Sequence, residues 1–113
     1  MYIELQTATI QSGSALSAEV ALGEKTLCGI YVPSSWTSAS ITFQVTPDDT
    51  NFSELWTDAG SELTLTVSAG AYTALDPKYW RGITGVKVRS GTSGSPVNQS
   101  STVALTLVTR SIY

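Results

Sequence analysis

Apolar residues recur at every second position along most of this chain, and this alternation constrains its fold more than any other feature. In 40–46, Ile41, Phe43 and Val45 alternate with hydroxyl and amide side chains. The same alternation is present in 15–22, 62–67, 84–89 and 102–110. Successive side chains of a β-strand point to opposite faces, so each segment predicts a strand with one apolar and one wettable face. Such strands are typical of antiparallel sheets that cover a core on one side.

Turn-forming residues separate the alternating segments at short intervals. Gly, Pro, Asp, Asn and Ser dominate these stretches, and each favours a turn conformation of the backbone. The predicted strands are roughly 2–10, 15–22, 26–32, 40–46, 53–57, 62–67, 71–75, 84–89 and 102–110. The Gly- and Ser-rich stretch 90–96 is predicted to be the longest loop. Helix signals are confined to 76–82, where Asp76 is a capping residue and Pro77 occupies the first helical position, with room for one turn.

Many short strands with regular turns and no helical crossover predict an all-β fold, namely an antiparallel β-sandwich. We expect a jelly-roll-like arrangement, with an immunoglobulin-like sandwich as the alternative. The chain has 113 residues, with neither an internal repeat nor a linker. Residues 1–113 are therefore expected to form a single β-sandwich domain, large enough to bury a core without disulfides or metals.

Charge is scarce, and this narrows the classes of partner. Charged residues make up 13% of the chain, about half the share usual in soluble domains, whereas 32 of the 113 residues are Ser or Thr. The net charge is −3 and the six basic residues are scattered, so we expect no nucleic-acid partner. No apolar run approaches the roughly 18 residues that span a bilayer, and the N-terminus lacks signal-peptide features, so we expect no membrane association.

The chain contains no histidine, which removes the commonest general base and metal ligand. A Ser-His-Asp or Cys-His arrangement is impossible, and Cys28, the single cysteine, has no partner for an intrachain disulfide. Asp48 and Asp49 are adjacent but are predicted to form a turn rather than an acid–base pair or, with Asp58, a calcium site. We therefore expect a protein that is not an enzyme and that uses neither a cofactor nor a metal.

The aromatic residues leave two interpretations open. Trp36 and Trp56 are predicted to fill the core between two sheets. Tyr79 and Trp80 lie in the predicted tight turn and are the candidates for exposed rings that could stack on a sugar. A surface poor in charge and rich in rings is also typical of the centre of protein–protein interfaces. This favours a particle component or a homo-oligomer.

The segment 29–49, with the sequence GIYVPSSWTSASITFQVTPDD, resembles small proteins encoded in the structural modules of tailed phages, prophages and gene-transfer particles. In that group a Pro-Ser-Ser-Trp corner and an Ile-Thr-Phe-Gln-Val strand lead into an Asp-rich turn. Segments 74–77, 86–92 and 96–99 look similar to the same group, so the likeness spans roughly 27 to 110. These motifs are structural and identify a scaffold rather than a site.

The resemblance implies a non-enzymatic virion protein with a β-sandwich fold, assembled in the cytoplasm of a bacterial host. A capsid decoration, cement or head-spike base protein on the head exterior is the expected role. Its partners would be the major capsid protein or other virion proteins, and further copies of itself on the particle. The alternative is a carbohydrate-binding adhesion module of a head spike or tail, with a cell-surface glycan as its partner. The predicted partner contacts are Tyr2, Ile3, Leu5, Tyr79, Trp80, Pro96 and Val97.

Overall fold

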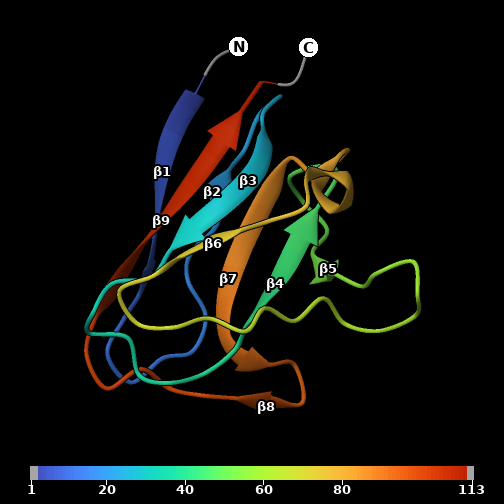
Figure 1. Ribbon diagram of the computed structural model, residues 1–113. Coiled ribbons are helices and arrows are strands. Elements are labelled where there is room, and N and C mark those ends of the chain that lie inside the picture. Colours follow the sequence, from blue (N-terminus) through green and yellow to red (C-terminus); the bar gives the residue numbers. More distant parts are fainter. Residues whose placement is uncertain (1–2, 112–113) are drawn as a thin grey trace.

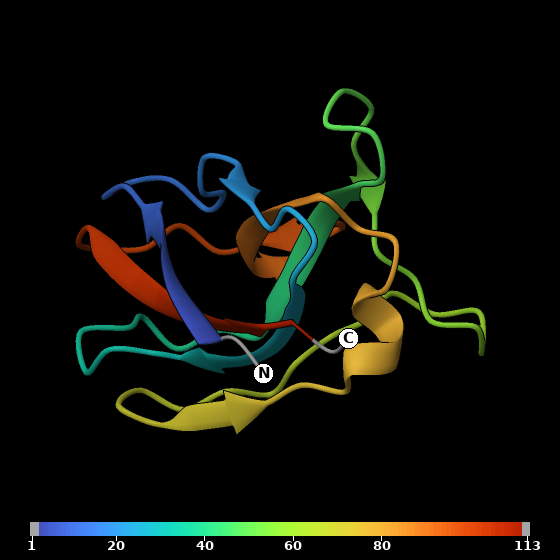
Figure 2. The ribbon, with the colours of Figure 1, turned by 90° about the horizontal axis from the view of Figure 1, so that it is seen from above.

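The alternating segments pair into two antiparallel sheets that face each other (Figure 1). The computed structural model describes residues 3–111. Sheet A consists, in order across the sheet, of β1 (Ile3–Ile10), β9 (Val103–Arg110), β3 (Thr26–Tyr31) and β6 (Tyr72–Ala74). Sheet B consists of β2 (Val20–Ala21), β7 (Gly85–Thr92), β4 (Ile41–Thr46) and β5 (Ser53–Glu54), with β8 (Ser95–Pro96) paired to the end of β7. Figure 2 looks along the two layers from above.

Consecutive strands cross from one sheet to the other, except at the β4–β5 and β7–β8 pairs. This double-sheet winding is that of a jelly roll. An immunoglobulin sandwich keeps its first two strands in one sheet, whereas β1 and β2 lie in different sheets here. The prediction of an all-β, antiparallel sandwich of jelly-roll type is therefore confirmed.

Three predicted segments differ from the structure. The segment 15–22 is reduced to the two residues of β2, with an isolated bridge between Leu16 and Arg89. The segment 62–67 forms isolated bridges but no strand. Its apolar side chains are partly buried against the core. Its backbone hydrogen bonds to Ile41 and Leu55 are isolated and do not extend into a ladder, so the alternation specified the buried side but not a continuous strand. The stretch 90–96 is not an open loop, because β7 continues to Thr92 and turns back into β8.

One hydrophobic core lies between the sheets. Ile41 and Phe43 of β4 face it with no exposed area, and Trp36 is buried as predicted, its Nε1 donating to the Ala39 carbonyl at 3.2 Å. A short 3-10 helix, η1 (Pro77–Trp80), closes one end of the sandwich. It begins as predicted, since the Asp76 carboxylate accepts a hydrogen bond from the Lys78 backbone N–H.

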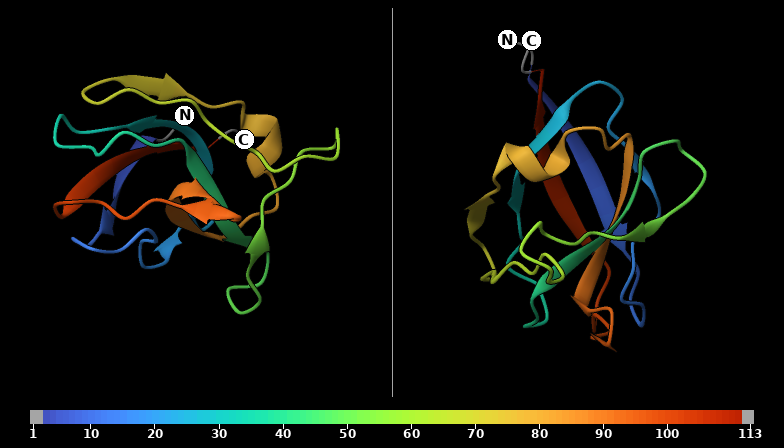
Figure 3. Two further views of the ribbon diagram at one scale, coloured as in Figure 1. Left: turned by 90° about the horizontal axis from the view of Figure 1, so that it is seen from below. Right: turned by 90° about the vertical axis from the view of Figure 1, so that its right-hand side faces the viewer.

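The two ends of the sandwich carry different elements. At one end β1 begins, β9 ends and η1 lies over the opening between the sheets, and we call this the η1 end (Figures 1 and 3). The β7–β8 hairpin lies at the opposite end. Between these two ends, each sheet has an outward face that points away from the core. Side chains on the outward faces can contact another molecule.

Candidate functional site

The outward face of sheet A presents large apolar side chains to solvent. Leu5 is opposite Val108 in the β1–β9 pair, and Tyr31 is opposite Tyr72 in the β3–β6 pair, so these side chains share one face. Ile3 is 50% exposed, Leu5 64%, Tyr31 40% and Tyr72 53%, while Val108 is half-buried. We call these five residues the apolar face. Ile30 and Leu107, which adjoin Tyr31 and Val108 in their strands, face the core with no exposed area.

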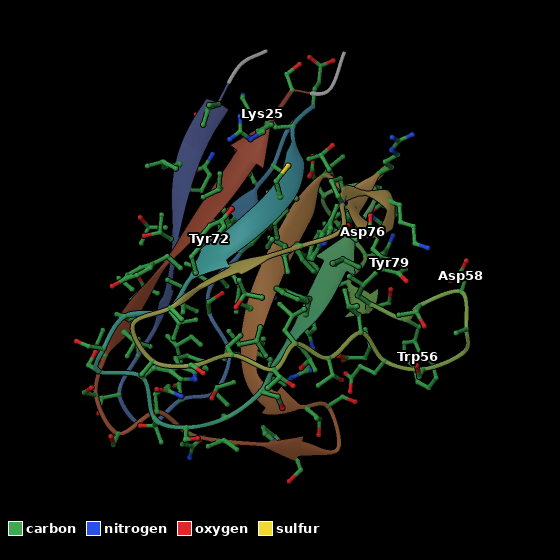
Figure 4. All side chains as sticks on the ribbon, in the orientation of Figure 1. Lys25, Trp56, Asp58, Tyr72, Asp76 and Tyr79 are labelled. Carbon is green, nitrogen blue, oxygen red and sulfur yellow. The ribbon has the colours of Figure 1, made fainter. Side chains whose placement is uncertain are left out.

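Gly29 makes room for the ring of Tyr72 on the apolar face. Gly29 of β3 is paired with Ala74, and the Tyr72 side chain leans diagonally across the strands toward it. A Cβ atom at Gly29 would overlap the Tyr72 hydroxyl. The absence of a side chain at Gly29 therefore lets the Tyr72 ring lie against sheet A, as Figure 4 shows for the labelled residue.

Charged groups are confined to the margin of the apolar face. The four strands of sheet A contain two charged residues, Glu4 near the start of β1 and Arg110 at the end of β9. Glu4 is paired with Lys25 at 3.1 Å, and Lys25 lies at the η1 end (Figure 4). The middle of the face therefore carries apolar and hydroxyl-bearing side chains, and no charged group there has to be desolvated when the face is covered.

The outward face of sheet B is organised in the opposite way, around a buried cation. Arg89 is 6% exposed, and its Nη1 and Nη2 donate to the two carboxylate oxygens of Glu54 at 2.6 and 3.0 Å. The same Nη1 also contacts Glu62 at 3.4 Å and the Thr42 hydroxyl at 3.3 Å. The hydrogen bonds from Arg89 lower the pKa of Glu54, against the smaller effect of burial, which raises it. This cluster ties Glu54 of β5 and Glu62 of the following segment to β7.

The pairing of Arg89 was not predicted. The alternation of β7 indicates only that Arg89 points away from the core. Its carboxylate partners lie 35 and 27 residues away in the sequence, and no local pattern joins them. An Arg at an outward strand position in a chain with few charges, together with two Glu residues at outward positions, is the one sequence signal for such a cluster.

Trp56 is exposed, which contradicts the prediction that it fills the core. It is 57% exposed and lies on the projecting loop that also carries Asp58 (Figure 4). The adjacent Leu55 is buried at 9% exposure, and consecutive side chains of an extended segment face opposite sides. Because Leu55 takes the inward position, Trp56 is directed to solvent.

Four of the predicted partner contacts lie within the described part of β1 and the β7–β8 hairpin, and they do not form one site. Ile3 and Leu5 belong to the apolar face. Pro96 is exposed and Val97 half-buried in the hairpin at the far end of the molecule. Tyr2 lies outside the described residues. Contact of any of these residues with a partner stays a prediction.

The two aromatic residues of η1 are less accessible than predicted. Trp80 is 1% exposed, so the prediction that its ring is exposed is wrong. The single turn of η1 directs Trp80 into the core, where its ring meets Phe43 edge-on with centroids 4.8 Å apart. Tyr79 is half-buried, and the Lys78 ammonium lies 4.9 Å from the centre of its ring. Trp80 cannot stack on a sugar from this position.

The Asp48–Asp49 pair forms a turn, as predicted. The Asp48 carboxylate accepts hydrogen bonds from the backbone and side chain of Asn51, from the Thr50 backbone and from the Thr46 hydroxyl. These bonds, those from Asn51 first, hold the pKa of Asp48 well below its ordinary value of 3.8. Asp49 adopts the left-handed conformation with φ of 64°. Within residues 3–111, no three His, Cys, Asp or Glu side chains gather as ligands of a metal ion.

Comparison with known proteins identifies a fold. Neither a protein-family model nor a curated protein sequence matches the chain. Among solved structures the chain is similar to the SPBc2 prophage-derived protein YomS, with 16% identity, 96% of this chain and 95% of that chain covered, and a TM-score of 0.56. At this identity the likeness to YomS shows a common fold and nothing of activity or partner.

Two further solved structures are more weakly similar. The Yersinia pseudotuberculosis-derived mitogen is 13% identical over 96% of this chain and 84% of that chain, with a TM-score of 0.44. The Drosophila NLP-core is 12% identical over 95% of this chain and 96% of that chain, with a TM-score of 0.45. At these TM-scores, neither likeness carries a functional argument. No helix within residues 3–111 is long and apolar enough to cross a membrane.

Proposed function

We propose that this chain is a non-enzymatic structural protein of a phage particle that binds other virion proteins through the apolar face of sheet A. The observation that carries the proposal is the exposure of Ile3, Leu5, Tyr31 and Tyr72 on one side of a sheet. The charged residue in register on that side is Arg110, at its margin. Contiguous exposed apolar side chains on a folded domain mark interaction sites. The jelly-roll fold, which recurs in viral capsid domains, and the likeness to a prophage-derived protein support the placement in a particle.

The role we propose within the particle is capsid decoration or cementing, with the major capsid protein as the partner. Such a protein acts through contact area, and the apolar face has the composition that interface centres share, with Tyr enriched and charge depleted. Many copies on one lattice would add avidity to a modest contact made by each. No bond-making chemistry is required of any residue.

The free edge of β1 supports self-association on the particle. β1 has eight residues and pairs with β9 on one side only. It contains no Pro and a single charged residue, Glu4, and its register with β9 is unbroken by a bulge. Natural sheets usually protect such an edge with charges, Pro or bulges, because it offers unpaired backbone groups to another strand. We therefore propose that copies meet at or near β1.

Co-sedimentation on a density gradient tests the proposed role. The purified protein is mixed with capsids of the encoding phage that lack it. We expect saturable binding at a fixed copy number per capsid. Leu5→Glu should weaken binding about tenfold or more by burying a charge in the contact, whereas Thr64→Glu, at an exposed position on the sheet B side, should not. A folded wild-type protein that never sediments with capsids would contradict the proposal.

A carbohydrate-binding adhesion module is the second candidate, and the exposure of Trp56 favours it. An indole ring that is 57% exposed on a projecting loop, beside Thr57 and Asp58, has both a stacking surface and polar neighbours. A glycan array probed with the wild type and with Trp56→Ala separates the two functions. If the wild type binds a glycan and Trp56→Ala does not, the result supports the adhesion function. If the array gives no signal, the adhesion function is excluded.

A further inference from the structure

The four outer strands of the two sheets differ in length, and β1 is the longest of them. β1 has eight residues, whereas β6, at the other edge of sheet A, has three, and β2 and β5, at the edges of sheet B, have two each. Natural sheets keep edge strands short because a long edge offers unpaired backbone groups to another chain. β1 is the outer strand at the left of Figure 1 and, within residues 3–111, pairs with β9 alone. It is therefore the edge that can accept a further strand over most of its length.

The apolar face extends to this free edge. Leu5 on β1 is 64% exposed and is the most exposed large apolar side chain among residues 3–111. It lies in one row with Val108 of β9 and Gly29 of β3. β1 contains one charged residue, Glu4, which is paired with Lys25 of its own chain at 3.1 Å. A strand added beside β1 would therefore extend the apolar face, and the carboxylate that it met would already have its cation.

A second copy of β1 suits this edge, and twofold symmetry limits how the two copies can pair. In an antiparallel pair of identical strands each contact occurs twice, so that residue i faces j and j faces i. A shift of one residue would turn the apolar side of one copy toward the core side of the other. The axis must therefore relate one residue to its own copy. The residues that meet this condition and keep Leu5 opposite the second β1 are Glu4, Leu5, Gln6 and Thr7.

Side-chain chemistry selects Leu5 among these four. An axis at Glu4 places two carboxylates directly opposite each other, which destabilises a strand pair. An axis at Gln6 or Thr7 places Leu5 opposite a threonine and Glu4 opposite an apolar residue. An axis at Leu5 packs the two Leu5 side chains together and places Glu4 opposite Gln6 of the second copy. The Gln6 amide already donates to Glu4 of its own strand at 3.3 Å, so these two groups match as donor and acceptor.

We propose that two copies of this chain pair antiparallel through β1 about a twofold axis beside Leu5. Sheet A has four strands in each copy, so the pair has a continuous sheet of eight, within the range of about 2–10 strands usual for sheets. The apolar faces of the two copies join into one surface, with a Tyr72 ring near each of its ends. This inference rests on the proposed function and deepens it, because the virion protein then contacts a surface that two chains build together.

Single cysteines on the outward side of β1 test the pairing and its register. The native thiol is first removed by Cys28→Ala, at a half-buried position. In that background Leu5→Cys places two thiols opposite each other, with Cβ atoms about 4.5–5.5 Å apart, close to the separation of about 3.5–4.5 Å found in disulfides. Thr7→Cys, the matched control on the same side of the same strand, places them about 13 Å apart along the strands. Under mild oxidation we expect Leu5→Cys to form a covalent dimer at least about tenfold faster than Thr7→Cys.

Light scattering of the protein in solution supplies the second measurement. We expect the wild type to have twice the 11.9 kDa mass of one chain. Leu5→Lys, which places two like charges at the axis, should dimerise at least about tenfold more weakly. Tyr72→Ala changes the apolar face at the edge of sheet A far from β1 and should leave the dimer intact. A wild type that keeps the mass of one chain at every concentration overturns the pairing, and a Thr7→Cys dimer that forms as fast as the Leu5→Cys dimer overturns the register.

Capsid co-sedimentation distinguishes failure of this inference from failure of the proposed function. Tyr72→Ala should weaken capsid binding while the dimer persists. A dimeric wild type that never sediments with capsids contradicts the virion role and leaves the pairing in place. A wild type that binds capsids as a monomer overturns the pairing and leaves the virion role in place.

Discussion

The outward faces of the two sheets differ in what covers them. The outward face of sheet B carries an ion-paired cluster, in which Arg89 of β7 binds Glu54 of β5 and Glu62 of the segment that follows it. Lys87 adds a cation–π contact to the Phe52 ring at 4.4 Å. Within residues 3–111, no such cluster covers sheet A, and the side chains of its apolar face are exposed or half-buried.

This difference separates stability from binding. On sheet B a charge is removed from water, so the loss of a partner from the Arg89 cluster should destabilise the fold. On sheet A the outward side chains are largely hydrated and contribute little to the folded state, although they are large enough to contribute to a contact. The outward side chains of sheet B therefore make contacts within the chain, whereas those of sheet A are available to a partner.

The largest effect that would test this comparison is the loss of Arg89. Arg89→Met leaves Glu54 and Glu62 as neighbouring carboxylates without their cation, and we expect it to lower the free energy of unfolding by about 3 kcal/mol. Urea denaturation followed by tryptophan fluorescence measures the change. Arg81→Met is the matched control at an exposed arginine, with an expected change within about 0.5 kcal/mol.

A compensating variant decides whether uncompensated charge causes the loss. Adding Glu54→Gln and Glu62→Gln to Arg89→Met removes both carboxylates, and we expect it to restore part of the lost stability. If Arg89→Met lowers the free energy of unfolding no more than Arg81→Met does, the outward face of sheet B contributes as little to stability as that of sheet A. The proposed difference between the two sheets would then be wrong.

A smaller change in the free energy of unfolding is expected at acidic pH, and the lowered pKa of Glu54 gives its direction. The hydrogen bonds from Arg89 hold the pKa of Glu54 below its ordinary value of 4.5. A carboxyl group whose pKa is lower in the folded state contributes stability that is complete above the unfolded pKa and is lost as pH falls through the folded pKa. The free energy of unfolding should therefore decline as pH decreases below about 4.5.

Denaturant titrations from about pH 7 to about pH 3 measure this decline. Glu54→Gln should make it shallower without abolishing it, because the lowered pKa of Asp48 acts in the same direction. In an Arg89→Met background the lowering effect of Arg89 on the pKa of Glu54 is gone and burial still raises it, so Glu54→Gln should no longer make the decline shallower. A steeper decline in Glu54→Gln than in the wild type would contradict the assignment.

The sequence predicted the parts of this structure that depend on neighbouring residues. The alternation of Ile41, Phe43 and Val45 places all three in the core, and the Asp76-Pro77 pair begins η1 as expected. Each is decided within a few residues, by side-chain direction in one case and by an orphan backbone N–H in the other. The β-sandwich class followed from the number and spacing of such segments, whereas the strand order that separates a jelly roll from an immunoglobulin-like sandwich came from the structure.

The parts that failed depend on which side of a segment meets the core. Leu55 and Trp56 are adjacent and both apolar, so alternation alone cannot choose which one faces inward. The apolar face escaped prediction as a whole for a similar reason, since Leu5 and Tyr72 come together only through the β1–β9–β3–β6 order. Of the predicted contacts, only Ile3 and Leu5 lie on it.

A modest loss of stability is expected from a substitution at Gly29, which makes room for Tyr72 on the apolar face. Gly29→Ala introduces a Cβ where the Tyr72 hydroxyl lies, and because this ring is exposed and free to move, we expect a cost of about 1 kcal/mol. In a Tyr72→Ala background the same change should cost nothing. A double-mutant cycle by urea denaturation measures the coupling. Equal costs in both backgrounds would show that Gly29 does not seat the ring.

The smallest effect on stability should come from the centre of the open face. Leu5→Thr keeps a residue that favours strands, removes exposed apolar surface, and should change the free energy of unfolding by no more than about 0.5 kcal/mol. Ile10→Thr is the matched control, because Ile10 lies on the same strand with no exposed area, and it should cost about 2–4 kcal/mol. Urea denaturation of the two variants compares the faces of one strand. Equal losses would mean that the outward side of β1 is held by the fold as firmly as the inward side, leaving no face of sheet A free for a partner.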